Sequence, residues 1–206
     1  MGTERIREAV TNWREDERGG VALVTIPVVA LLLTGAVLAI SMLGSFSSNQ
    51  RDAQTAADAA ALAAVQEWDR LLEGHYDEHS AATSFSSFWS VIAPANGQGW
   101  NPAIRAAAEE FAARNDARIT HFSVDPIQQT VTVEVEHLRT VAKTSSRMRA
   151  EAEAGVNVGQ NSGLCIQSGQ IGWRIGGTCY TNPFGSGIGW TIPDINPFET
   201  EPRLTG

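Results

Sequence analysis

Two histidines four residues apart have the spacing of a metal-binding pair. His75 and His79 enclose Asp77 and Glu78 in the run His-Tyr-Asp-Glu-His, and on a helix both imidazoles would face one side. The order is not that of a zinc-protease helix, Gly74 precedes the run, and a third ligand would have to come from another part of the chain. We therefore expect a solvated polar segment, and we predict no metal site and no cofactor.

Two glycine-rich runs come nearest to the nucleophile elbow of a serine hydrolase, which needs Gly-x-Ser-x-Gly between a strand and a helix. They are residues 159–163 (Gly-Gln-Asn-Ser-Gly) and residues 185–189 (Gly-Ser-Gly-Ile-Gly). Neither has the required order, and both lie in a region without helical periodicity, so we expect them to form turns. We predict no catalytic residues and no enzymatic activity.

The two cysteines of the chain are Cys165 and Cys179. In an oxidising compartment they would pair and close a loop of about 15 residues, which would stabilise the fold by about 3 kcal/mol. The alternatives are two free thiols or a metal site, and two ligands alone make a poor zinc site. We favour the disulfide.

The stretch from Gly20 to Leu43 contains no charged residue. As a helix it would extend about 36 Å at about 1.5 Å per residue, enough to cross a hydrocarbon core of about 30 Å. Four arginines precede it, whereas Arg51 is the first basic residue after it, and cytoplasmic flanks retain the basic residues. We predict one transmembrane helix over residues 20–43, a cytoplasmic leader over residues 1–19, and a C-terminal part outside the cytoplasm.

The chain has a net charge of −8. No block of Lys or Arg with interleaved aromatic residues is present to neutralise phosphates, and the acidic surplus would repel them. Nucleic acid is therefore excluded as a partner, and no small-molecule substrate is predicted.

Residues 44–73 are dominated by Ala and other strong helix formers, so the helix should continue beyond the membrane. Small side chains recur on one face of it and would let another element approach closely. They are Ala53, Ala56, Ala57, Ala60 and Ala64. The pattern leaves open whether this helix-packing interface meets the chain's own domain, a second copy or another protein.

The remainder predicts an α+β domain over residues 74–158, followed by an irregular, disulfide-tied tail over residues 159–206. Periodicity and turn signals place a short helix and a longer, well-capped helix before an antiparallel hairpin. A third strand is possible in an Ala/Glu run that also favours helix. The predicted elements are helices 82–91 and 102–115, capped by Asn101, and strands 118–124, 130–137 and 147–158.

Three features together resemble the Tad-type (Flp) pilus-assembly proteins of the TadE/TadG-like family. They are residues 17–23 (Glu-Arg-Gly-Gly-Val-Ala-Leu), Pro27 in the apolar run, and residues 54–63 (Gln-Thr-Ala-Ala-Asp-Ala-Ala-Ala-Leu-Ala). The resemblance implies a structural or assembly role in a pilus or secretion apparatus of the cell envelope. Its partners would be the membrane, other pilus or secretion-system proteins, and a second copy through the N-terminal helix.

In pilin-like members of such families a prepilin peptidase cleaves after a glycine, and a glutamate follows five residues later. Cleavage between Gly19 and Gly20 would put Val24 at that position, so the buried carboxylate that aligns neighbouring helices is missing. A retained membrane anchor with an assembly role fits these residues better than a major pilin.

A membrane-tethered binding or sensor domain is the alternative function. Its recognition surface would be the aromatic tail after Gly159, which contains Trp173, Tyr180, Phe184, Trp190 and Phe198.

Overall fold

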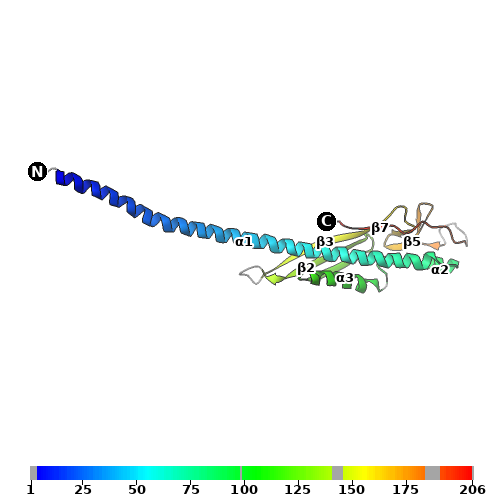
Figure 1. Ribbon diagram of the computed structural model, residues 1–206. Helices are drawn as coiled ribbons and strands as arrows, with labels where there is room; N and C mark the ends of the chain where they lie inside the picture. The colour runs from blue at the N-terminus through cyan, green and yellow to red at the C-terminus, as the bar shows by residue number, and fades with distance from the viewer. Residues whose placement is uncertain (1–3, 98, 141–145, 184–190, 206) are drawn as a thin grey trace. The chain divides into compact units, whose positions relative to one another are not determined.

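The computed structural model describes residues 4–97, 99–140, 146–183 and 191–205; within the first helix, side chains are described for residues 28–37 and from residue 48 onward. The chain forms two compact units, Met1–Ser47 and Ser48–Gly206. Helix α1 (Glu4–Ser80) contributes residues to both units, and the other elements belong to the second unit (Figure 1).

The predicted transmembrane segment lies in the first unit, where the backbone of α1 is helical throughout residues 20–43. Residues 28–37 are exposed. Residues 20–27 and 38–43 of the predicted span, and the leader over residues 1–19, lie outside the side chains that the structure describes. Where side chains are described, no helical stretch is both long and apolar enough to cross a membrane.

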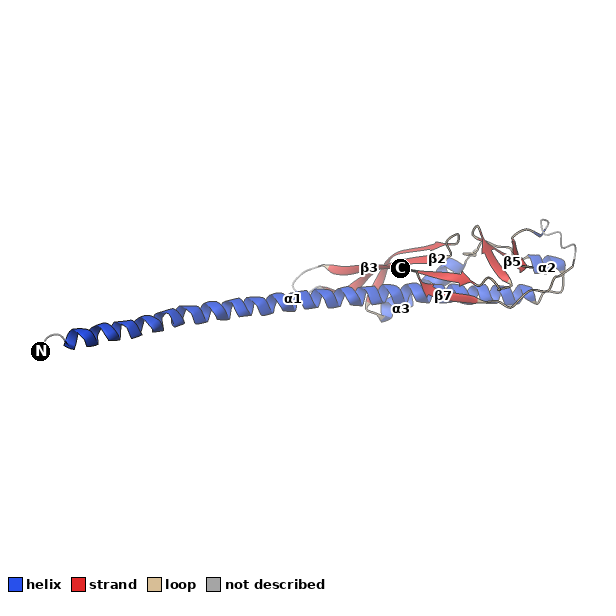
Figure 2. Ribbon diagram, turned by 90° about the horizontal axis from the view of Figure 1, so that it is seen from above, coloured by secondary structure: helices blue, strands red, loops and turns tan. Residues whose placement is uncertain are grey.

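In its described residues, the second unit contains the C-terminal part of α1, two further helices and seven strands (Figure 2). The elements after α1 are α2 (Phe85–Trp89), α3 (Trp100–Arg114), β1 (Ala117–Asp125), β2 (Thr130–Thr140), β3 (Arg147–Val158), β4 (Leu164–Gln167), β5 (Gln170–Ile175), β6 (Thr178–Tyr180) and β7 (Thr200–Leu204).

The larger sheet is antiparallel, with the strand order β1-β2-β3-β7. Val133 of β2 pairs with Phe122 of β1 and with Ala152 of β3. The predicted hairpin and the third strand are therefore confirmed. The fourth strand, β7, was not predicted and comes from the segment expected to be irregular.

An alternation of period two explains why the Ala/Glu run forms β3 and not a helix. Ala152 and Ala154 are buried, whereas Glu151 and Glu153 are exposed. This is the pattern of a strand with one covered face, and the gain from burying that face outweighs the intrinsic helix propensity of the residues.

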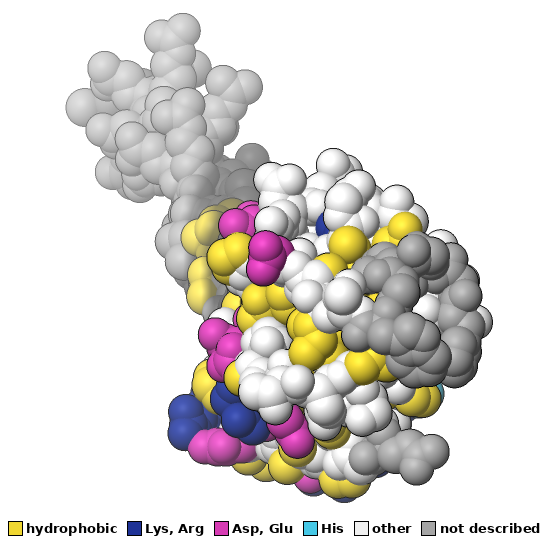
Figure 3. All heavy atoms as spheres, turned by 90° about the vertical axis from the view of Figure 1, so that its right-hand side faces the viewer, with side chains coloured by type: hydrophobic (Ala, Val, Ile, Leu, Met, Phe, Trp, Pro, Cys, Tyr) yellow, Lys and Arg dark blue, Asp and Glu magenta, His cyan; other side chains and the backbone are white. Residues whose placement is uncertain are grey.

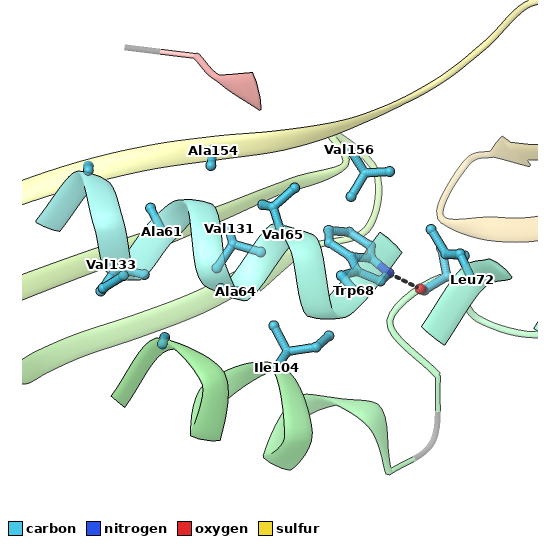
Figure 4. Packing of buried hydrophobic residues seen from close by; sticks show 14 of the residues in the cluster. Ala61, Ala64, Val65, Trp68, Leu72, Ile104, Val131, Val133, Ala154 and Val156 are labelled. Carbon is cyan, nitrogen blue, oxygen red and sulfur yellow. Dashed lines mark hydrogen bonds between the residues drawn. The ribbon is translucent and has the colours of Figure 1, made fainter. Parts of the chain in front are cut away.

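One hydrophobic core joins α1, α3 and the larger sheet (Figure 4). Trp68 and Leu72 of α1, Ile104 of α3 and Val131 of β2 are each fully buried in it. The indole Nε1–H of Trp68 donates a hydrogen bond of 2.8 Å to the carbonyl of Ala95 (Figure 4), so the buried polar atom is satisfied. Residues 48–80, the sheet and part of the tail thus share one core.

The tail is more regular than predicted. Strands β4, β5 and β6 form a second antiparallel sheet in that order, and the disulfide predicted between Cys165 and Cys179 is confirmed. The disulfide joins the two outer strands of this sheet, β4 and β6. Phe184 and Trp190 lie outside the described residues.

The structure also corrects the predicted helix ends. Helix α1 continues to Ser80, beyond the expected end at residue 73, and α2 is shorter than the predicted helix 82–91. Helix α3 begins at Trp100, and its N-cap is Gly99 and not Asn101. Gly99 has a φ of 96°, a left-handed conformation that glycine adopts without strain.

Candidate functional site

The Ala-rich face of α1 is buried within the chain's own domain. Ala53, Ala56, Ala57, Ala60 and Ala64 each have no exposed surface, and all but the first belong to the hydrophobic core. The sequence left open what covers these alanines, and in the structure the chain's own sheet and helices cover them. The small side chains let the strands and α3 approach the helix closely.

The exposed apolar surface of α1 lies N-terminal to that face. In the described segment of residues 28–37 the large aliphatic side chains are between 51% and 75% exposed. They are Val28, Val29, Leu31, Leu32, Leu33 and Val37. An apolar stretch of this kind needs a nonpolar environment that the chain's own described residues do not supply.

His75 and His79 lie on α1, and the prediction of a solvated segment is wrong for both. His79 is only 9% exposed and His75 is half-buried. The ring centroids of His75 and His79 are 4.3 Å apart. His75 also makes an edge-to-face contact with Trp100, with the two ring centroids 5.6 Å apart. The helix carries through Gly74, so the pair continues the buried face of Trp68 and Leu72 at spacings of three or four residues.

The position of His79 was therefore readable from the sequence. Trp68, Leu72, His75 and His79 are separated by four, three and four residues, the same periodicity that identified the rest of the core face. The glycine at position 74 misled the prediction, since a single glycine costs a helix only about 1 kcal/mol.

Both histidine rings bond to backbone carbonyls. The Nε2–H of His75 donates to Val91 at 2.8 Å, and the Nδ1–H of His79 donates to the His75 carbonyl at 2.8 Å. Burial lowers the pKa of His75, and the bond to the Val91 carbonyl offsets part of that effect. The carboxylate of Glu78 is exposed beside them, and one potential ligand atom from each of these three residues lies within 4.8 Å of the others.

A second polar cluster surrounds Glu136 on β2. This carboxylate is 7% exposed and contacts the guanidinium groups of Arg118, Arg147 and Arg149, each at 3.2 Å. The hydrogen bond from Arg147 is the main reason that the pKa of Glu136 lies below its usual range. The cluster joins strands β1, β2 and β3, which indicates a structural role.

The serine of the first glycine-rich run is structural. Ser162 is fully buried, and its Oγ accepts a hydrogen bond from the backbone N–H of Glu199. A Cβ at the neighbouring Gly163 would lie 2.0 Å from the carbonyl oxygen of Asn196, so only glycine fits there. The second run, residues 185–189, lies outside the described residues.

The tail aromatics that the structure describes pack inward. Trp173 is fully buried, its indole Nε1–H donates to the Phe88 carbonyl, and Phe198 stacks with Tyr76. Trp173 is therefore unavailable to the recognition surface of a sensor domain, whereas Tyr180 and Phe198 are only partly buried. Figure 3 looks onto the end of the second unit where α2 lies, and few charged side chains reach the middle of this face. Ser84, Ser86 and Ser87 are exposed at this end.

Comparison with known proteins gives one family. Searches of curated proteins and of solved structures return no significant match. Residues 19–67 match a family model described as putative Flp pilus-assembly TadE/G-like. This range contains the apolar run and all five alanines of the buried Ala-rich face. The resemblance seen in the sequence is confirmed over this segment, where residues 19–67 are similar to the putative Flp pilus-assembly TadE/G-like family.

Proposed function

We propose that this protein is a membrane-anchored structural or assembly component of a Tad-like pilus or secretion apparatus. The match of residues 19–67 to the Flp pilus-assembly family carries this proposal. The match begins just before the apolar run and ends inside the domain core, so the anchor and the start of the folded domain both belong to the matched segment. The protein acts through contacts of its domain and not through chemistry.

The anchor in this proposal is the uncharged stretch over residues 20–43. The exposed aliphatic side chains at 28–37 support it, since a bilayer would remove them from water. The arginines before the stretch favour a cytoplasmic N-terminus and an extracytoplasmic unit over residues 48–206.

The partner contact must use a surface other than the buried Ala-rich face. The end of the domain near α2 supports such a contact, because it exposes few charged groups to desolvate in the described part of that face (Figure 3). The similarity to the family favours pilus or secretion-system proteins as partners. The proposal also includes self-association through residues 20–43.

Cell fractionation and co-purification test the role. Replacing Leu32 by Arg should release the protein from membranes and abolish its co-purification with pilus components, since a charge at the centre of a bilayer-spanning helix is unfavourable by about 3 kcal/mol. The matched control is Gln66→Arg on the exposed side of α1, which should change neither result. Unaltered membrane retention of the Leu32 variant, or full piliation without the protein, would contradict the proposal.

The intact mass of the membrane-extracted protein tests processing. A mass beginning at Met1 fits a retained anchor, as the valine at position 24 favours. A mass beginning at Gly20 would indicate cleavage by a prepilin peptidase and incorporation into the filament.

A further inference from the structure

Three potential metal ligands, His75, Glu78 and His79, lie together at the C-terminal end of α1. His75, Glu78 and His79 occupy positions i, i+3 and i+4, which bring them to one side of the helix. One ligand atom from each lies within 4.8 Å of the other two. Burial of His79 and partial burial of His75 exclude a merely solvated polar run.

The backbone determines which ring nitrogen of each neutral histidine carries the proton. A carbonyl only accepts, so His75 must donate from Nε2 to Val91, and His79 must donate from Nδ1 to His75. The nitrogens left with lone pairs are Nδ1 of His75 and Nε2 of His79. Neither of these nitrogens has a hydrogen-bond partner among the residues that the structure describes.

This arrangement is the one that metal-binding histidines use. A ligating imidazole characteristically donates its other N–H to a carbonyl or carboxylate, which orients the ring and makes the ligating nitrogen more basic. Here both rings already make that bond. Glu78 is exposed, so its carboxylate is free to turn towards the two rings.

We propose that His75, Glu78 and His79 bind a divalent transition-metal ion of the Zn²⁺ type. Two imidazoles favour Zn²⁺, Ni²⁺ or Cu²⁺ over Mg²⁺ and Ca²⁺, which prefer all-oxygen ligand sets. Three protein ligands leave a fourth tetrahedral position for water. The site is independent of the proposed pilus role.

The bound ion would fasten the end of α1 to the segment before α3. The His75 imidazole is hydrogen-bonded to Val91, and Trp68, further back on α1, is hydrogen-bonded to Ala95. Orienting the His75 ring by a metal would strengthen this connection between the helix and residues 91–95. An ion that binds only the folded state also raises the unfolding temperature.

Equilibrium dialysis of the full chain against Zn²⁺ tests the site. The protein is purified in detergent without a histidine tag, and bound metal is measured by elemental analysis. We expect one Zn²⁺ per chain, little affected by an excess of Mg²⁺. His79→Gln should weaken binding about 100-fold or more, and Glu78→Gln about tenfold. Zn²⁺ should raise the unfolding temperature of the parent chain and not that of His79→Gln.

Two features make the test decisive. His121→Gln is the matched control, because His121 is exposed on β1, and it should bind Zn²⁺ as the parent chain does. Glu78→Gln keeps both histidine–carbonyl bonds, so it stays informative if a histidine variant fails to fold. Absence of stoichiometric Zn²⁺, equal binding by the parent chain, His79→Gln and Glu78→Gln, or the same loss in His121→Gln would overturn the proposal.

Discussion

Phe88 and Trp173 stack with their ring centroids 4.6 Å apart, and the Trp173 indole Nε1–H donates a 2.8 Å hydrogen bond to the Phe88 carbonyl. The two residues are 85 positions apart in the chain. One lies on the short helix α2 and the other on β5 of the smaller sheet. Their contact is one of those that join the disulfide-containing hairpins to the main core.

This contact predicts a graded effect of substitutions at Trp173. Trp173→Phe keeps the ring but loses the hydrogen bond and leaves the carbonyl unpaired, so it should lower the free energy of unfolding by about 1–3 kcal/mol. Trp173→Ala should lower it by about 3–5 kcal/mol through the cavity that it creates. Urea denaturation measures both values.

The matched control for the hydrogen bond is Trp89→Phe. The Nε1 of Trp89 is buried without a hydrogen-bond partner in the described part of the chain, so its removal relieves an unsatisfied donor while retaining an aromatic ring. This variant should be clearly less destabilised than Trp173→Phe. Equal losses in the two variants would show that ring size, and not the hydrogen bond, determines the effect.

Burial of the Ala-rich face predicts that a larger residue there damages the fold. Ala60 has no exposed surface, so Ala60→Leu should lower the free energy of unfolding by about 1–3 kcal/mol. Gln66→Leu, on the exposed side of the same helix, should change it by no more than about 0.5 kcal/mol. A fully stable Ala60→Leu domain that fails only to bind a partner would restore this face as an intermolecular surface.

The disulfide predicts a redox dependence of stability. Cys165 and Cys179 are 14 positions apart, and closing a loop of that size stabilises by about 3 kcal/mol in the chain-entropy model. Reductant should therefore lower the unfolding temperature of the parent chain and leave the Cys165→Ser/Cys179→Ser double variant unchanged. A parent chain unaffected by complete reduction, verified by thiol alkylation, would contradict this expectation.

The periodicity of apolar residues along the chain predicted the elements that depend mainly on their own sequence. The β1–β2 hairpin and β3 follow from alternation of apolar and polar residues, and the Ala-rich face follows from helical spacing. The sequence did not predict which element covers the Ala-rich face, because small residues favour close approach of any partner.

The missed elements depend on contacts between distant residues. Strand β7 exists through its pairing with β3, in which Leu204 lies opposite Ala154, and its Thr-Glu-Pro-Arg-Leu sequence has no strong strand signal of its own. Gly163 is needed because Asn196 passes against it, which only the folded structure reveals. The burial of the histidine pair, in contrast, could have been predicted from helical spacing. It was missed because Gly74 gave a misleading sign that the helix does not continue.

The carboxylate of Glu136 predicts an acid dependence of stability. Its hydrogen bond with Arg147, aided by the charge of Arg118, holds its pKa below its usual range in the folded state. The unfolded chain therefore binds this proton more readily than the folded one, so the contribution of Glu136 is complete above the unfolded pKa. It is lost as pH falls through the lower folded pKa.

Comparing the parent chain with Glu136→Gln across this range tests the cluster. At neutral pH the variant should be less stable, and the difference should shrink as the pH is lowered from about 5 to about 2, because protonation then removes the same charge from the parent. The control is Glu109→Gln, whose carboxylate pairs with Arg105 on the exposed surface of α3 and should matter little. A stability difference for Glu136→Gln that stays constant over the whole range would mean that shape and hydrogen bonding, and not the carboxylate charge, hold β1, β2 and β3 together at this point.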